Sequence, residues 1–249
     1  MVSIKTKEEI EKINIAGTVV YNVLELMKTS IKPGITTEKL NEIADKYIRD
    51  NKCTPSFLNY DGYPKSVCIS INDEVVHGIP GKRKIKTGDI VKVDVGACYK
   101  GYHADSARTY IVGKTTNEIK ALVEDTERAL YKGLSVIKEG IKLNEVSKAI
   151  ESVAKEKGYG VIRELTGHGI GTVVHEDPYI FNYENDESEL ILKEGMTLAI
   201  EPMFSLKKRY IWMLEDGWTI TTQDGSVAAH FEHTIVVTKE GYKILTGEW

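Results

Sequence analysis

Four carboxylates and one imidazole are the residues of this 249-residue sequence whose types and settings best suit metal binding. Three of the carboxylates lie inside apolar runs typical of buried strands, where an ionised group needs a partner. An oxygen-rich set with one nitrogen donor suits Mn, Fe(II), Co or catalytic Zn, and it differs from the sulfur-rich set of a structural zinc site. With bidentate or bridging carboxylates, the set can hold two ions. The five residues are Asp94, Asp105, His168, Glu201 and Glu232.

Two of these acids are predicted to lie on one β-hairpin. If Lys100 and Gly101 form its two-residue turn, Asp105 lies opposite Gly96, and Asp94 lies opposite Ala107. The two carboxylates then share one face as diagonal neighbours, roughly 7–8 Å apart at the backbone. Exposed acids on an edge hairpin are the common alternative. The apolar strand around Asp94, residues 91–95, argues against it.

The histidine of the set is flanked by glycines. Gly167 and Gly169 predict a tight turn around His168 and a close approach of another backbone. Glycines can also cradle a phosphate. Because no Lys-Ser/Thr pair follows and the GxGxxG spacing is absent, a nucleotide site is not expected.

The elements that must position these residues follow from periodicity and capping. Thr6 with Glu9 forms a candidate capping box for a first helix, which ends before the Lys32-Pro33-Gly34 breaker. A second candidate box, Thr115 with Glu118, opens a later helix. The sequence predicts helices over about 6–31, 40–48, 115–134 and 143–158, and strands over 66–71, 89–97, 104–112, 161–165, 197–202, 210–221 and 230–237.

The order helix, helix, strands thus occurs twice, with a division near Gly113. This predicts an α+β fold of two pseudo-symmetric halves that share one antiparallel sheet, covered on one face by four helices. A site would lie in the cleft between the halves. Because long Pro/Gly/Ser-rich linkers are absent, we expect residues 1–249 to form a single catalytic domain.

The motifs around the five residues resemble those of the type I methionine aminopeptidases over essentially the whole chain. The resemblance implies the pita-bread (creatinase/aminopeptidase) fold, which agrees with the repeated halves. The sequence lacks the insertion of roughly sixty residues found in the type II family. The matching segments are VDVGACYKGYHADSART (93–109), GHGIGTVVHEDP (167–178), AIEP (199–202) and FEHT (231–234).

The resemblance implies a metalloaminopeptidase that removes the initiator methionine from nascent proteins, prefers a small second residue and uses water activated by two metal ions. The five residues above would be the ligands, with Asp105 and Glu232 bridging the ions. Glu201 would also act as general base, and His77 and His175 would contact the scissile amide and the substrate carbonyl. His103 and His230 are weaker candidates for supporting the ligands. The resemblance places methionine among Tyr60, Tyr63, Cys68 and Trp218, with Phe57 as a further candidate.

Composition limits the possible partners. A formal net charge of −4 gives no strong field for nucleic acid or an anionic membrane, and no run approaches the ~20 apolar residues of a membrane helix. Three unpaired cysteines fit a reducing compartment. We therefore expect a cytoplasmic monomer that acts on peptides and nascent chains with N-terminal methionine, with transient contact to the ribosome.

Two rival functions remain. Other pita-bread peptidases cleave X-Pro bonds, but they usually carry a longer amino-terminal domain. Relatives that have lost their ligands act as binding proteins, whereas all five ligand positions and both outer histidines are present here. The sequence leaves the physiological metal open, because this donor set accepts several ions.

Overall fold

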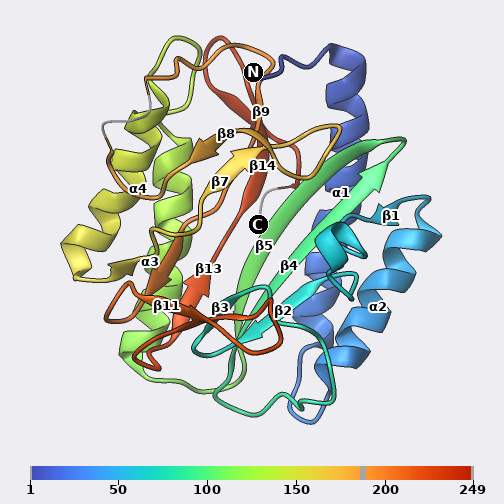
Figure 1. The fold of residues 1–249 in the computed structure, drawn as a ribbon, viewed down its shortest axis with the longest axis vertical. Helices are drawn as coiled ribbons and strands as arrows, with labels where there is room; N and C mark the ends of the chain where they lie inside the picture. The colour runs from blue at the N-terminus through green and yellow to red at the C-terminus, as the bar shows by residue number, and fades with distance from the viewer. Residues whose placement is uncertain (1, 186–188, 248–249) are drawn as a thin grey trace.

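The computed structural model describes residues 2–185 and 189–247, which form two α/β halves side by side (Figure 1). In the first half, helices α1 (Lys7–Ser30) and α2 (Thr37–Asp50) accompany a four-stranded sheet. Its long hairpin is formed by β4 (Ile90–Tyr99) and β5 (Tyr102–Ile111). The short strands β1 (Thr54–Pro55) and β2 (Cys68–Ile71) pair with opposite ends of β4.

The expected capping box begins α1. The Thr6 hydroxyl accepts a hydrogen bond from the Glu9 amide, and the Glu9 carboxylate accepts one from the Thr6 amide at 2.7 Å. These bonds satisfy amides that the first turn cannot pair within the helix. The buried face of α1 then joins the core of the first half with β4 and α2, through residues such as Leu24, Val93 and Ile48.

The second half repeats the plan with α3 (Asn117–Leu134), α4 (Leu143–Lys157) and a five-stranded sheet. Gly158, in the left-handed conformation, ends α4 as expected. A separate core of buried residues from α3, α4 and this sheet supports the second half. The sheet order is β15 (Tyr242–Ile244), β14 (His233–Val237), β9 (Thr197–Ile200), β7 (Gly167–Gly169) and β8 (Glu176–Ile180).

The expected single sheet is wrong, because the strands form two main sheets, which meet where β5 of the first lies beside the start of β14 in the second. Between β5 and β14, the Glu232 amide donates to the Ala107 carbonyl at 2.9 Å. The Thr234 hydroxyl accepts from the Asp105 amide at 3.0 Å and donates to the Asp105 carbonyl at 2.8 Å. A side chain thus replaces part of the backbone ladder at this junction. The expected plan of two similar α+β halves, with helices and antiparallel sheets, is confirmed.

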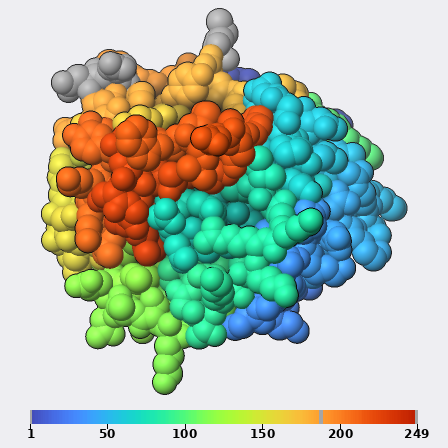
Figure 2. All heavy atoms as spheres, turned by 60° about the horizontal axis from the view of Figure 1, so that its bottom comes forward, coloured from blue at the N-terminus to red at the C-terminus, as the bar shows by residue number. Residues whose placement is uncertain are grey.

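Two three-stranded sheets complete the structure. One contains β6 (Gly160–Val161), β10 (Met203–Ser205) and β13 (Ala228–His230). The other contains β3 (Glu74–Val76), β11 (Ile211–Met213) and β12 (Ile220–Thr222). Figure 2 shows the β11–β12 hairpin in orange-red at the surface, beside the teal segment that carries β3. Its side chains Trp212, Met213 and Leu214 are exposed.

Several predicted boundaries are wrong for local reasons. The cap of α3 is Thr116 rather than Thr115, and its hydroxyl accepts from the Ile119 amide, so Glu118 stands one position too early to complete a box with Thr116. Residues 210–221 form a hairpin because the Asp216 carboxylate accepts from the amides of Trp218 and Thr219. Within residues 161–165 only Val161 belongs to a strand.

Two further predicted strands are interrupted. The run 197–202 ends at Ile200, and β10 begins at Met203; the run 230–237 is broken at residues 231–232. Pro202 lacks an amide for a ladder, and the Glu232 amide is bonded to β5 rather than to a neighbour in its own sheet. None of the described helices is both long and apolar enough to cross a membrane.

Candidate active site

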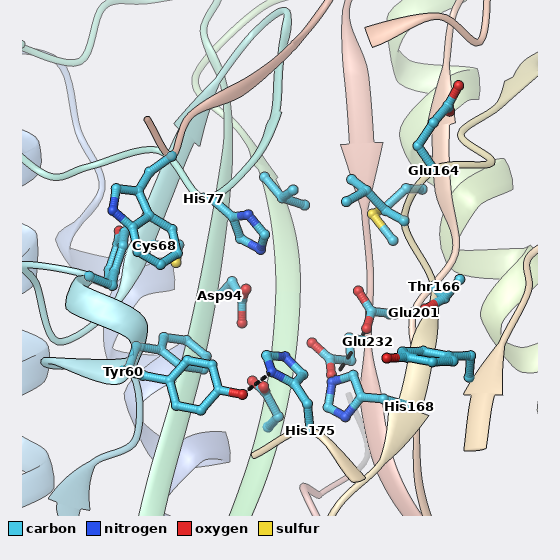
Figure 3. A pocket seen from close by; sticks show the side chains of 18 residues that line it. Tyr60, Cys68, His77, Asp94, Glu164, Thr166, His168, His175, Glu201 and Glu232 are labelled. Atoms are coloured by element: carbon cyan, nitrogen blue, oxygen red, sulfur yellow. Dashed lines mark hydrogen bonds and ion pairs between the residues drawn. The ribbon is translucent and has the colours of Figure 1, made fainter. Parts of the chain in front are cut away.

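A cavity of about 240 Å³ lies between the two halves (Figure 3). The structure brings all twelve site residues predicted from the sequence to its lining, although they come from segments spread over 176 positions of the chain, from residue 57 to residue 232. They are Phe57, Tyr60, Tyr63, Cys68, His77, Asp94, Asp105, His168, His175, Glu201, Trp218 and Glu232.

The β4–β5 hairpin has the register expected from its turn. Asp94 pairs with Ala107, and Asp105 pairs with Gly96. Lys100 and Gly101 both have positive φ, 48° and 81°, as a two-residue hairpin turn requires. Opposite residues of an antiparallel pair point to the same side, so both aspartates face the cavity. The hairpin therefore supplies two acids from a rigid, paired backbone.

The two glutamates lie at the strand interruptions described above. Glu201 follows β9, and its carbonyl accepts a hydrogen bond from the Asn182 side chain at 3.0 Å. Glu232 precedes β14, and its carbonyl accepts from the Ser106 hydroxyl. Each break places its carboxylate in the cavity while side chains satisfy the backbone that left the ladder.

His168 lies in strand β7, so the expected tight turn around it is wrong. The expected close backbone approach is confirmed: a Cβ on Gly167 would lie 2.5 Å from the Ala199 oxygen, and one on Gly169 would lie 2.1 Å from the Asp177 oxygen. The His168 ring has its Nδ1 2.9 Å from the Gly169 oxygen, which leaves Nε2 directed at the Glu201 carboxylate, 3.5 Å away. The glycines therefore let a buried imidazole enter a crowded sheet.

The cluster has the properties of a cation site. Burial raises the pKa of Asp94 to about 6 and raises the pKa of Asp105 well above its usual value, with the neighbouring Asp94 charge adding to the latter effect. Burial likewise raises the pKa of Glu201 and of Glu232. One buried oxygen each of Asp94, Asp105 and Glu232 has no hydrogen-bond partner within the described residues. Buried acids that repel one another and lack donors are best compensated by a cation.

The geometry fits this interpretation. Asp105, His168 and Glu232 each offer one ligand atom, and these atoms lie within 4.8 Å of one another. Burial lowers the pKa of His168 to about 3, with the neighbouring His175 as a second cause. The imidazole is therefore neutral at pH 7, which is the form that binds metals. Asp94 and Glu201 border the same space in Figure 3.

The histidines of the cavity wall are held by aromatic residues. The His175 Nδ1 lies 2.9 Å from the Tyr60 hydroxyl, and its ring lies 4.4 Å from that of His168. His77 has a positive φ of 58°, an unusual conformation for a side chain of this size, and its ring lies 6.4 Å from that of Trp218. Burial lowers the pKa of His77 to about 4, so it too is neutral at pH 7.

An apolar wall stands beside the acids. Phe57, Tyr63, Cys68 and Val174 form a buried cluster, against which Tyr60 and Trp218 pack. The Tyr63 and Trp218 rings meet edge to face at 5.1 Å, and the Tyr63 hydroxyl donates to the Gly78 carbonyl at 3.0 Å. Burial raises the pKa of the Cys68 thiol well above its usual value, which keeps the thiol protonated and apolar in character.

The supporting histidines differ in position. His230 is buried with its Nε2 3.5 Å from the Glu201 carboxylate, which agrees with a supporting place. His103 is absent from the cavity lining and has its Nδ1 2.9 Å from the Ser56 hydroxyl. His233, next to Glu232 in the chain, is also absent from the cavity lining, and its Nδ1 lies 2.9 Å from the Thr246 hydroxyl.

Six lining residues were missed by sequence reasoning. Tertiary structure alone brings them to the cavity, because their local sequence has no pattern that distinguishes them from other strand and loop residues. They are Val76, Glu164, Leu165, Thr166, Tyr179 and Met203.

Comparison with known proteins shows similarity to peptidases. Residues 11–239 match metallopeptidase family M24. The chain is 46% identical over 246 residues to methionine aminopeptidase 1 of Bacillus subtilis, with 99% of each chain covered. It is 45% identical over 247 residues to methionine aminopeptidase of Escherichia coli K12, covering 98% of this chain and 94% of the relative.

Solved structures of related peptidases superpose closely on this chain, which confirms the expected pita-bread fold. The methionine aminopeptidase of Thermotoga maritima superposes with a TM-score of 0.97 and 46% identity, with both chains fully covered. The prolidase of Pyrococcus furiosus superposes with a TM-score of 0.80 and 27% identity, but only 66% of its chain is covered.

Proposed function

The chain belongs to metallopeptidase family M24, and we propose that the residues lining its cavity, together with divalent metal ions, hydrolyse the peptide bond after an N-terminal methionine. Because the chain is 46% and 45% identical to two methionine aminopeptidases over nearly its whole length, it is a metal-dependent aminopeptidase that removes the initiator methionine. One observation carries the proposal: a buried acidic cluster and an apolar wall suited to a thioether share one cavity.

The acidic cluster is proposed to hold two ions. Asp94, Asp105, His168, Glu201 and Glu232 would be the ligands, and Asp105 and Glu232 would be shared between the ions. The support is the set of unpartnered buried oxygens and the close approach of three ligand atoms. Divalent ions in such a site lower the pKa of water and polarise the substrate carbonyl.

Proton transfer is assigned to Glu201. Its carboxylate lines the cavity beside the other acids of the cluster, where it can accept a proton from water held in the site. It would accept the proton released as water attacks and pass it to the departing amine. The Nε2 atoms of His230 and His168 each lie 3.5 Å from this carboxylate.

His77 and His175 are assigned to the substrate. A neutral imidazole offers an N–H donor, and the low pKa of His77 preserves this form. His175 would donate to the substrate carbonyl oxygen, where negative charge develops, and His77 would contact the scissile amide. A donor already in place when that charge develops favours the transition state over the bound substrate.

Methionine would be selected by the apolar wall. Methionine is unbranched and flexible, so it suits a narrow space between rings. Tyr63 and Trp218 are fixed against each other, while Phe57, Tyr60 and Cys68 complete the wall. We propose that the limited room of the cavity also restricts the second residue to small side chains.

The cellular setting is part of the same proposal. We expect the chain to act as a cytoplasmic monomer on nascent chains and to contact the ribosome transiently. The support is its similarity to bacterial methionine aminopeptidases. Sedimentation of the purified protein tests the monomer directly.

Peptide cleavage tests the activity. The metal-loaded protein should release free methionine from Met-Ala-Ser and leave an X-Pro peptide intact, while a Glu232→Gln variant releases none. Cleavage of X-Pro peptides would instead assign the activity of the prolidases that share the fold. Absence of cleavage by well-folded, metal-loaded protein would favour a binding role.

A further inference from the structure

His175 lies at the end of a loop whose backbone is irregular. Residues 170–175 connect β7 to β8 without belonging to either strand. The Ile170 amide donates to the Thr197 carbonyl, and the His103 amide donates to the Gly171 carbonyl at 2.8 Å. These bonds fix the beginning of the loop. The part nearest His175 needs a different support.

Glu176, the residue after His175, provides that support. Its Oε1 accepts hydrogen bonds from the Thr172 amide at 2.7 Å and from the Thr172 hydroxyl at 3.1 Å. The carboxylate thus ties the first residue of β8 back to the third residue of the loop. His175 lies between these two points.

The amino-terminal segment holds this carboxylate from the other side. The Lys5 ammonium lies 2.6 Å from Glu176 Oε2, and the Ser3 hydroxyl donates to the same oxygen at 2.9 Å. Lys5 also donates to the Ser3 hydroxyl. The side chains of Lys5 and Glu176 are only 5% and 14% exposed, so this is a partly buried ion pair between segments 171 positions apart.

The backbone fixes Lys5 on its own account. Lys5 directly precedes Thr6, the cap of α1, and its amide donates to the Gly195 carbonyl at 2.9 Å. Gly171 leaves room for the pair, because a Cβ there would lie 2.2 Å from Lys5 Cε and 2.7 Å from Glu176 Oε1. A cation anchored by a helix start therefore reaches into a loop of the candidate active site.

We propose that Lys5 and Glu176 are positioning residues that hold His175 in place for the reaction. The inference rests on the proposed function, since it assigns His175 a substrate contact. A positioning residue on a rigid element matters because a displacement of about 1 Å in a catalytic group can reduce the rate by about 100-fold. The alternative is an ion pair that contributes only to stability.

Substitution of Lys5 distinguishes a positioning role from a contribution to stability alone. Lys5→Met keeps the length of the side chain and removes its charge. Lys39→Met is the matched control, because Lys39 forms an exposed ion pair with Glu42 at 2.7 Å on α2. With metal and Met-Ala-Ser, and at a temperature where each variant is folded, Lys5→Met should lower kcat roughly 10- to 100-fold with little change in KM or metal affinity. Lys39→Met should match the wild type.

A double-mutant cycle identifies the residue through which Lys5 acts. If Lys5 acts through His175, Lys5→Met combined with His175→Ala should be no slower than His175→Ala alone. If the two losses multiply, Lys5 acts elsewhere and the proposal fails. Gly171→Ala provides a second variant, which displaces the pair without removing any charge and should reproduce the kcat loss.

Amide exchange tests the same contact without activity. In Lys5→Met, the Thr172 amide should exchange with solvent at least roughly 10-fold faster, because its acceptor is no longer held. Unchanged exchange together with unchanged kcat would overturn the inference. An inactive wild type would instead contradict the proposed function, and the exchange result would still decide whether Lys5 orders the loop.

Discussion

Replacing Asp94 by asparagine is predicted to stabilise the metal-free protein at neutral pH and to weaken its stabilisation by metal. Asparagine has nearly the same shape but cannot ionise. In the folded chain, burial raises the pKa of Asp94 from 3.8 to about 6. This difference corresponds to up to ~3 kcal/mol of stability.

The direction in which stability changes with pH follows from proton uptake on folding. Between pH 3.8 and about pH 6, Asp94 is ionised in the unfolded chain but protonated in the folded one, so folding binds a proton. Stability therefore falls as the pH rises through this window, and the full cost is present above pH 6. Without metal, the free energy of unfolding of the Asp94→Asn variant should exceed that of the wild type by up to ~3 kcal/mol at pH 7. This difference should shrink towards pH 4.

Urea unfolding in the presence of a chelator, at pH 4.5 and pH 7, measures this difference. Asp50→Asn is the matched control, because Asp50 forms an exposed pair with Lys46 and should change stability by less than ~0.5 kcal/mol. Added Mn or Co at 100 times the wild-type Kd should stabilise the wild type by about 2.7 kcal/mol for each ion bound, and the Asp94→Asn variant by less. If the variant is the less stable protein at pH 7 without metal, or gains as much from metal, Asp94 is not part of a cation site.

Three further substitutions test separate parts of the site. Glu232→Gln should reduce kcat/KM by at least about 100-fold while the far-UV circular dichroism stays native, because a shared ligand is lost; near-normal activity would refute two-ion binding. Trp218→Ala should raise KM for Met-Ala-Ser roughly 10-fold with metal affinity unchanged, because the edge contact with Tyr63 disappears; an unchanged KM would remove Trp218 from the methionine site. Gly169→Ala should cost about 3 kcal/mol in urea unfolding, because its Cβ would lie 2.1 Å from the Asp177 oxygen; wild-type stability would show that the strand can move apart.

Sequence reasoning succeeded where the determinants are local. The Lys100-Gly101 turn fixes the register of its hairpin, so the pairing of Asp94 with Ala107 was predictable from the turn alone. The Thr6–Glu9 box and the Gly158 cap are likewise properties of a few adjacent residues. Periodicity located all four helices.

The sequence did not predict the features that are decided by distant segments of the chain. Gly167 and Gly169 have no side chains to give a strand pattern, and β7 exists because its neighbours approach closely enough to pair with it. The breaks beside Glu201 and Glu232 depend on Asn182 and Ala107, which lie far away along the chain. The junction of the two main sheets depends on bonds between β5 and the start of β14, such as those of the Thr234 hydroxyl with the backbone of Asp105, 129 positions away along the chain.

The candidate site shows the same division. Apolar strands around Asp94, Glu201 and Glu232 identified acids that need a partner, and the structure brings them into one cavity. The methionine wall followed from family resemblance, since nothing local distinguishes Tyr63 or Trp218 from other buried aromatics. The roles of these residues, and the extent of a single domain over residues 1–249, stay predictions.

Titration of metal-stripped protein with Mn, Co, Fe(II) or Zn, with bound metal and methionine released from Met-Ala-Ser measured in the same samples, tests the central claim most directly. Without metal, the protein should release no methionine, and methionine release should rise as up to two ions bind per chain. Undiminished methionine release by protein shown to contain no metal would contradict it.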